Sequence, residues 1–366
     1  MLLFKYLSRE IWKNFILILV ALTGLLLLTR LITLLVELSS AGIQLKDYFR
    51  LVIFLLPWFL TFLLPLAALL ATIFLFMRLS QDQELLAFES LGIPFSRLIV
   101  PVLALAVLVL VLDAVVAFKY LPWSKKAFRN FLFELTERKI ERGIPPKKFV
   151  SLLPGLSLFV EKAWGHGRQF AVVFMVDETS AREKGLIFAK KGELFTGHRR
   201  IEFHLYQGYL YLVSKDLRNF QALSFKEYIY RLDIAKLEKK RRRTRGEMSL
   251  TELKKAALSY PPDHKKRFYY LSEYYQRLAL PWAAFFLPLI GAPLGALVKG
   301  SGRGMGFFLA VVLYLGYYFL LSGVNSLAQS GSLPPSSILV VPNLVLALGA
   351  GLLILAFQRG IIGRGK

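Results

Sequence analysis

The distribution of apolar residues constrains this chain most. Three long apolar runs come first, a polar and basic segment follows between Lys119 and Tyr275, and three more apolar runs complete the chain. A membrane-spanning helix needs about 20 consecutive apolar residues. Six spans are therefore predicted: Phe15–Val36, Leu51–Met77, Leu98–Phe118, Leu278–Val298, Met305–Leu327 and Ile338–Phe357. A mean hydropathy of +0.52 is too high for a typical soluble domain of this length.

The positions of the cations in the short loops predict the orientation, because cytoplasmic loops of membrane proteins collect Lys and Arg. With the N-terminus inside, ten cations lie on the inner side: Lys5, Arg9, Lys13, Arg78, Arg97, Lys299, Arg303, Arg359, Arg364 and Lys366. The short outer loops hold only two, Lys46 and Arg50. Both termini are therefore expected in the cytoplasm and the large middle segment outside it.

The middle segment is predicted to be a β domain. Short runs rich in aromatic and β-branched residues indicate strands at Phe149–Val160, Phe170–Val176, Leu186–Ala189, Ile201–Leu205, Tyr209–Val213 and Ala222–Tyr230. Tyr206-Gln207-Gly208 is interpreted as a hairpin turn, and Met248–Leu258 as a short amphipathic helix. Strand spacing of this kind is typical of a sandwich, a jelly roll or an open barrel. The expected domains are helices 1–3 in residues 1–119, a jellyroll-like β domain in 120–274 and helices 4–6 in 275–366.

No pattern in the sequence indicates a catalytic, cofactor or metal site. There is no P-loop motif for ATP, no cysteine, and no metal-ligand spacing among the histidines at positions 166, 198, 204 and 264. The glycine-rich segment Gly300–Gly306 is interpreted as a flexible loop. The basic run Lys239–Arg245 has two open interpretations, a solvated linker or a contact for anionic lipid headgroups or sugar phosphates. Nucleic acid is not expected, because the segment lies outside the cytoplasm.

The inner loop between the second and third spans has the features of a short helix. Ser80 and Gln83 form a predicted capping box, Asp82 and Glu84 are acids in the first turn, and Gly92 with Pro94 ends the helix. Leu85, Leu86 and Phe88 then form an apolar patch. Two readings stay open: Glu84 stabilises the helix start by about 0.3–1 kcal/mol, or the helix docks onto a partner.

Arg30 is an arginine inside the first predicted span, about 22 Å from Phe15 at 1.5 Å per residue. An arginine near the centre of a membrane helix costs on the order of 2.5–3.5 kcal/mol on insertion scales, so a partner is expected. Glu37, seven residues further on, is one candidate. A lipid phosphate, which a guanidinium can bind with two parallel hydrogen bonds, is another. A third interpretation is that the side chain snorkels to the outer membrane interface.

Several motifs in this chain resemble the lipopolysaccharide-export permease family, LptF/LptG, along nearly the whole length. They are Tyr6-Leu7-x-Arg9-Glu10, Glu84-Leu85-x-Ala87-x-x-Ser90-x-Gly92, Tyr275-x-Arg277-Leu278-Ala279-x-Pro281, Ala292-Pro293-Leu294-Gly295, Gly302-Arg303-Gly304 and Pro342-Asn343-Leu344. The start of the chain is closer to the LptF branch. One departure is Val298-Lys299-Gly300-Ser301, where the family often has a proline-arginine pair.

The resemblance implies a permease subunit of an ABC transporter in the bacterial inner membrane. It implies a second permease in a heterodimer, two copies of a cytoplasmic P-loop ATPase, and periplasmic jellyroll bridge proteins with a single-span adaptor. Lipopolysaccharide is the implied cargo, extracted from the outer leaflet. The implied ATPase-coupling residues are Asp82, Glu84, Leu85, Leu86, Phe88 and Gly92. The residues assigned to lipid phosphates are Arg30, Lys46, Arg50 and Arg277.

Three other functions remain open at this point. One is export of a different anionic glycolipid, and another is an ATP-independent scaffold that binds envelope lipids. The third is a membrane enzyme that modifies envelope lipids, which predicts a catalytic cluster at the outer membrane surface that the sequence does not contain.

Overall fold

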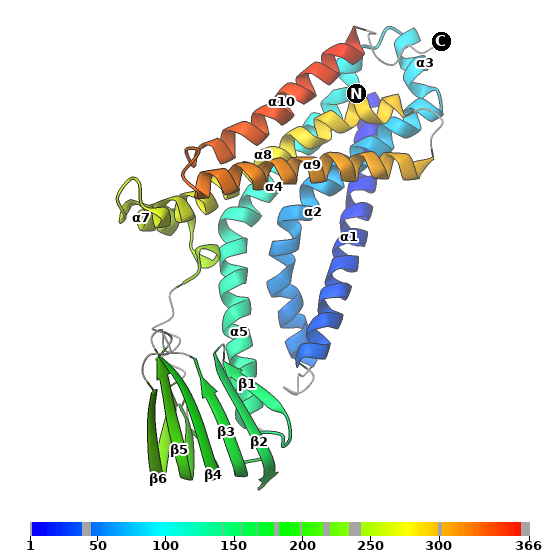
Figure 1. Cartoon of the computed structure of the whole chain (residues 1–366). Helices are drawn as coiled ribbons and strands as arrows, with labels where there is room; N and C mark the ends of the chain where they lie inside the picture. Colours follow the sequence, from blue (N-terminus) through cyan, green and yellow to red (C-terminus); the bar gives the residue numbers. More distant parts are fainter. Residues whose placement is uncertain are drawn as a thin grey trace. The chain divides into compact units, whose positions relative to one another are not determined.

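The computed structural model describes residues 2–38, 45–141, 143–153, 155–165, 167–178, 183–197, 200–214, 220–233, 243–298 and 302–359. The chain divides into two compact units. The first comprises residues 1–33, 48–128 and 243–366 and is built from helices. The second comprises residues 34–47 and 129–242 and contains the β-sheet (Figure 1).

Six helices of the described chain are long and apolar enough to cross a membrane, which confirms the six predicted spans. They are α1 (Leu2–Leu38), α2 (Leu45–Gln81), α4 (Phe95–Val115) continued through the π-helical turn η2 (Val116–Tyr120) into α5 (Leu121–Glu141), α8 (Lys265–Leu297), α9 (Arg303–Gln329) and α10 (Ser337–Gln358). Most of these helices extend well beyond the apolar runs, because a helical backbone satisfies its own hydrogen bonds on both sides of the apolar region.

Helices α2 and α8 form the centre of the helical unit. In the most apolar 18-residue stretch of each helix, 78% of the residues are buried in α2 and 72% in α8, against 11% in α1. Gly291 and Gly295 of α8 let the two backbones approach closely, since a Cβ atom on Gly295 would lie 2.4 Å from the carbonyl oxygen of Ile73 on α2. This is the small-xxx-small packing common between membrane helices. Helices α4, α9 and α10 pack around α8 (Figure 1).

A short amphipathic helix, α7 (Leu250–Leu258), precedes α8 and confirms the predicted helix at 248–258. Ser249 and Glu252 form a capping box, in which Ser249 Oγ accepts from the Glu252 backbone and the Ser249 backbone donates to Glu252. That backbone hydrogen bond holds the pKa of Glu252 below its ordinary value, and the ion pair with Arg243 acts in the same direction. Leu253 and Ala257 are the buried residues of α7, which packs on α8.

The second unit contains one antiparallel sheet whose six described strands follow chain order, which confirms the inserted β domain. The strands are β1 (Phe149–Leu153), β2 (Leu156–Trp164), β3 (Gln169–Asp177), β4 (Glu183–Gly197), β5 (Arg200–Ser214) and β6 (Phe220–Asp233) (Figure 1). The predicted strand Phe149–Val160 is two strands, with Gly155 at φ +87° in the turn between them.

The hairpin predicted at Tyr206-Gln207-Gly208 is wrong, because these residues lie inside the continuous strand β5. Gln207 has a φ of +53° without leaving the sheet, and Val172 of β3 has the same φ. All four ladders from β2 to β6 omit the same row of residues, Glu161, Val172, Lys190, Gln207 and Lys226. We call this row the crease.

The crease explains how a single sheet encloses a core. In a regular strand Val173 and Met175 would face one side of the sheet and Phe170 the other, yet all three are buried in β3. The strand therefore turns its opposite face towards the core on the two sides of the crease. Apolar residues from both sides of the crease belong to one buried cluster, including Leu158, Met175 and Ile187 from one side and Phe170, Leu194, Phe203 and Leu205 from the other. The sheet therefore bends along the crease, and its two halves bury their apolar faces together.

Candidate functional site

The predicted inner helix exists as α3 (Glu84–Ser90), separated from α2 by only Asp82 and Gln83. The predicted capping box is wrong, because α2 continues through Gln81 and Ser80 therefore lies inside α2. Ser80 Oγ instead donates to the carbonyl oxygen of Ala296 on α8 at 3.0 Å. Gln83 adopts a left-handed conformation (φ +58°) and makes no side-chain cap. Gly92 follows the helix at φ +73°, as expected for a helix end.

The apolar residues of α3 do not all face outward. Leu85 is buried, and Phe88 packs against the main hydrophobic cluster of the helical unit. Leu86 and Leu91 are the exposed pair, with 60% and 75% of their surface accessible. Sequence reasoning missed Leu91, because it follows the last helical residue. The exposed large apolar side chains here are thus Leu86 on α3 and Leu91 directly after it.

Glu84 belongs to an ion-pair network that joins three helices. Arg78 near the end of α2 donates to Glu84 at 2.9 Å, to Asp82 at 3.2 Å and to Glu10 of α1 at 2.5 Å. Tyr6 of α1 accepts a hydrogen bond from Arg78 at 2.8 Å and donates to the Glu84 carboxylate at 3.1 Å. We call these five residues the Arg78 network. Sequence reasoning did not connect them, because their contacts span up to 78 residues.

Charge in the Arg78 network is unbalanced, since one guanidinium meets three carboxylates. The side chains of Glu10 and Glu84 are 21% and 29% exposed, and that of Asp82 is 52% exposed. The Glu84 and Asp82 carboxylates thus remain partly accessible from outside the network. The partly buried ion pairs of the network are also screened less by salt than exposed pairs are.

The four cations assigned to lipid phosphates lie in different environments. Arg30 on α1 and Lys46 and Arg50 on α2 are all exposed. The alternative partner of Arg30, the side chain of Glu37, lies outside the described residues. The neighbour of Lys46, Asp47, is fully buried and accepts from Arg138 of α5 at 3.0 Å.

Arg277, the fourth of these cations, is buried with only 2% of its side chain exposed. Its guanidinium donates to Glu273 at 2.8 Å and to the backbone carbonyls of Met248 at 2.7 Å and of Arg245 and Gly246 at 3.0 Å. These acceptors surround the 3-10 helix η3 (Arg245–Glu247), which leads into α7. The structure thus gives Arg277 protein acceptors where a lipid phosphate was expected.

Further contacts hold the η3 segment in place. Arg245 forms an ion pair with Glu273 at 3.4 Å and lies 4.2 Å over the ring of Tyr269. Gly246 lies against the side chain of Lys125 on α5, since an added Cβ atom would be 3.0 Å from Lys125 Cδ. Of the predicted basic run 239–245, residues 239–242 lie outside the described part of the chain.

Within the described residues no group of three or more His, Cys, Asp or Glu side chains could hold a metal ion. His204 lies 3.4 Å from Glu202 and 3.7 Å from Glu227, in the middle of paired strands. His166 and His198 fall outside the described residues.

Comparison with known proteins finds similarity along most of the chain. The family model "Lipopolysaccharide export system permease LptF/LptG" matches residues 5–356 of this chain. The chain is also similar to the uncharacterized protein RP871 of Rickettsia prowazekii (strain Madrid E), with 25% identity over 190 residues. That match covers 52% of this chain and 52% of the relative, so it spans about half the length of each.

Proposed function

The chain belongs to the lipopolysaccharide export permease family LptF/LptG, and from this premise we propose that it is one permease subunit of an ABC transporter. It takes lipopolysaccharide from the outer leaflet of the bacterial inner membrane and passes it to a periplasmic β bridge. A separate cytoplasmic P-loop ATPase supplies the energy, and a second permease of the family completes the membrane unit. The family match over residues 5–356 carries this proposal, because it includes both the helices and the β-sheet.

The ATPase docks on α3 in this proposal. Glu84 and Asp82 supply negative charge, and Leu86 on α3 and Leu91 directly after it supply exposed apolar surface. An apolar pair flanked by charge is the usual anatomy of a small interface, with an apolar centre and a polar rim. Leu85 and Phe88, which pack inward, fix the position of α3 and do not contact the partner.

The cargo contacts in this proposal are cations for phosphates and an apolar surface for acyl chains. Arg30, Lys46 and Arg50 are the exposed cations near the outer side of α1 and α2. In the β domain Leu223 of β6 pairs with Leu210, which packs against the core, yet Leu223 is 51% exposed. Leu223 therefore offers exposed apolar surface on β6, where we expect an acyl chain to bind. The β6 edge also offers backbone groups for strand addition by a bridge protein.

The experiment that tests the proposal is affinity purification of the tagged chain in mild detergent, followed by mass spectrometry of proteins and lipids. Recovery of a P-loop ATPase, a second permease and lipopolysaccharide supports it. Recovery of the chain alone, under conditions that preserve other ABC complexes, rejects it in favour of the scaffold. Recovery of the ATPase with another anionic glycolipid identifies a different cargo.

A variant sharpens this experiment. Glu84→Ala removes the docking charge and is expected to lower ATPase recovery several-fold. Glu89→Ala is the matched control, since Glu89 is an exposed carboxylate on the same helix and makes no ion pair or side-chain hydrogen bond recorded among the described residues. Equal ATPase recovery with both variants would remove Glu84 from the docking site.

A further inference from the structure

The inner ends of α1 and α3 are connected through Arg78, although the two helices are far apart in sequence. Tyr6 and Glu10 lie one turn apart on the same face of α1, and both contact the Arg78 guanidinium. Glu84, the first residue of α3, contacts both Arg78 and Tyr6. A displacement of Glu84 therefore acts on α1 directly through Tyr6 and indirectly through Arg78.

The linker between α2 and α3 gives α3 little independent freedom. Only Asp82 and Gln83 separate the two helices, and both backbone N–H groups donate to carbonyls of α2, those of Arg78 and Ser80. Gln83 is the one left-handed residue in this linker. A force on α3 is thus resisted at Gln83 and transmitted through the Glu84 side chain.

Among the described spanning helices, α1 is the least buried and can therefore move most easily when the Arg78 network changes. Leu7, Ile11, Phe15 and Ile18 are buried in its first half and Leu34 near its far end, whereas Leu25, Leu28 and Ile32 between them are more than 60% exposed. Leu28 is 18 residues beyond Glu10, or about 27 Å along the helix axis. A small rotation at the Arg78 network therefore becomes a larger displacement near Leu28.

We propose that Arg78 is a positioning residue that, with Tyr6 and Glu10, couples the α3 docking helix to the inner end of α1. A partner that engages Glu84 withdraws one carboxylate from Arg78 and one acceptor from Tyr6, and α1 is released or re-seated. The role of α3 as a docking helix rests on the proposed function. The connection from Glu84 to α1 lies within the chain and needs no partner protein.

The test uses the full chain, purified in detergent and spin-labelled at two introduced cysteines, Leu28→Cys on α1 and Ile53→Cys on α2. The chain has no cysteine of its own, so the labels are specific. Both side chains are exposed, by 62% and 54%. Pulsed electron paramagnetic resonance then gives the distribution of distances between the two labels.

We expect this distribution to shift or broaden when the connection is cut by Tyr6→Phe with Glu10→Gln, and also by Glu84→Ala. The control Glu89→Ala should leave it unchanged, and Arg78→Lys should restore more of the parent distribution than Arg78→Gln. An unchanged distribution in the Glu84→Ala and Tyr6→Phe/Glu10→Gln chains, with parent thermal stability, overturns the proposal. If both chains lose stability, Tyr6→Phe alone is measured, and an unchanged distribution there also overturns it.

This measurement separates the two proposals because it needs no partner. Failure to purify an ATPase with the chain rejects the proposed function and leaves the distance result standing. An unaltered distance distribution rejects the coupling through Arg78, even if the ATPase is recovered.

Discussion

At the scale of single residues, two arginines at membrane helices have opposite surroundings. Arg30 is exposed on α1, whereas Arg277 is buried and donates to Glu273 and to three backbone carbonyls near η3. A buried charge that loses its partners destabilises a protein by about 3–5 kcal/mol, and an exposed one contributes much less. The two residues should therefore respond differently to substitution.

We expect Arg277→Gln to lower the thermal unfolding midpoint of the purified chain by several degrees, because three carbonyls lose their guanidinium donor and Glu273 loses one of its two arginine partners. Arg30→Gln should leave the midpoint within about one degree but weaken photo-crosslinking between α1 and lipopolysaccharide. Fluorescence-detected size exclusion after heating measures stability, and a photoreactive residue at Leu28 reports the lipid. Intact crosslinking in the Arg30→Gln chain would make this arginine a structural residue.

The sequence alone marked Arg30 as unusual, whereas Arg277 entered only with the family resemblance, and neither indicated that Arg277 is structural. The position of Arg30 in an apolar run requires only the chain order. The partners of Arg277 at Arg245, Gly246 and Met248 are backbone groups up to 32 residues away, and no residue pattern marks them. Glu84 illustrates the same limit, since its helix was predictable and its contacts with Tyr6 and Arg78 were not.

At the scale of elements, the close packing of α2 and α8 depends on two small residues. Any side chain at Gly295 meets the backbone of Ile73, at 2.4 Å from its carbonyl oxygen and 3.0 Å from its Cα atom. Neither of these atoms can move without displacing α2. The sequence shows this glycine, but the backbone that leaves no room for a side chain belongs to the other helix, α2.

We therefore expect Gly295→Ala to destabilise the helical unit by about 1–3 kcal/mol, the usual range for overpacking. The matched control is Gly323→Ala on α9, where an added Cβ atom meets nothing within 4 Å. That substitution should be neutral or slightly stabilising, because alanine favours helix. Equal unfolding midpoints for the two variants in detergent would contradict the close contact.

The crease is the corresponding feature of the β domain. Helices and strands were predictable from their periodicity, but the alternation in β5 is interrupted at Gln207, so the sequence pattern resembles two strands and a turn. The correct pairing requires β4 and β6, which align Lys190 and Lys226 with this residue. Strand bends of this kind are set by neighbouring strands and cannot be read from one segment.

Gly208, beside the crease, gives a direct test. A Cβ atom there would lie 2.0 Å from the carbonyl oxygen of Phe188 and 2.6 Å from the ring of Phe225. We expect Gly208→Ala to make β4 to β6 cleavable by limited proteolysis under conditions where the parent chain is intact. Gly185→Ala is the control, since its nearest contact would be an ordinary 3.6 Å to Asp177. Equal protease resistance of the two chains would show that the bend at this row is adaptable.

At the scale of the whole molecule, the proposed function depends on which side of the membrane each part occupies. If α3 faces the cytoplasm, an ATPase can reach Glu84, Leu86 and Leu91, and the sheet must then meet the periplasm. The distribution of ten inner and two outer cations favours that orientation. The opposite orientation would place α3 where no ATP is available, and the proposed docking would fail whatever its geometry.

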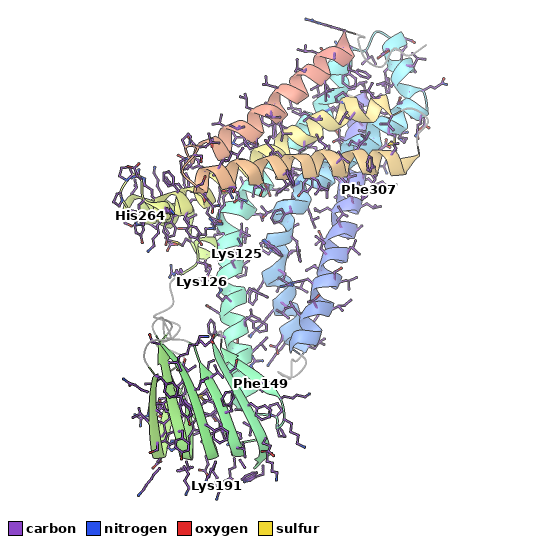
Figure 2. All side chains as sticks on the ribbon, in the orientation of Figure 1. Lys125, Lys126, Phe149, Lys191, His264 and Phe307 are labelled. Carbon is purple, nitrogen blue, oxygen red and sulfur yellow. The ribbon has the colours of Figure 1, made fainter. Side chains whose placement is uncertain are left out.

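Labelling of single introduced cysteines tests the orientation in the membrane, because the chain has no cysteine of its own. Leu91→Cys places a thiol at an exposed position beside α3, and Lys191→Cys places one at an exposed position in the β domain (Figure 2). A membrane-impermeant maleimide applied to cells with a permeabilised outer membrane should label Lys191→Cys and spare Leu91→Cys until the inner membrane is disrupted. The reverse pattern would invert the topology and with it the assignment of α3 to the ATPase. An odd number of spans between α3 and the sheet places them on opposite sides of the membrane. Labelling of both thiols while the inner membrane is intact would contradict this topology.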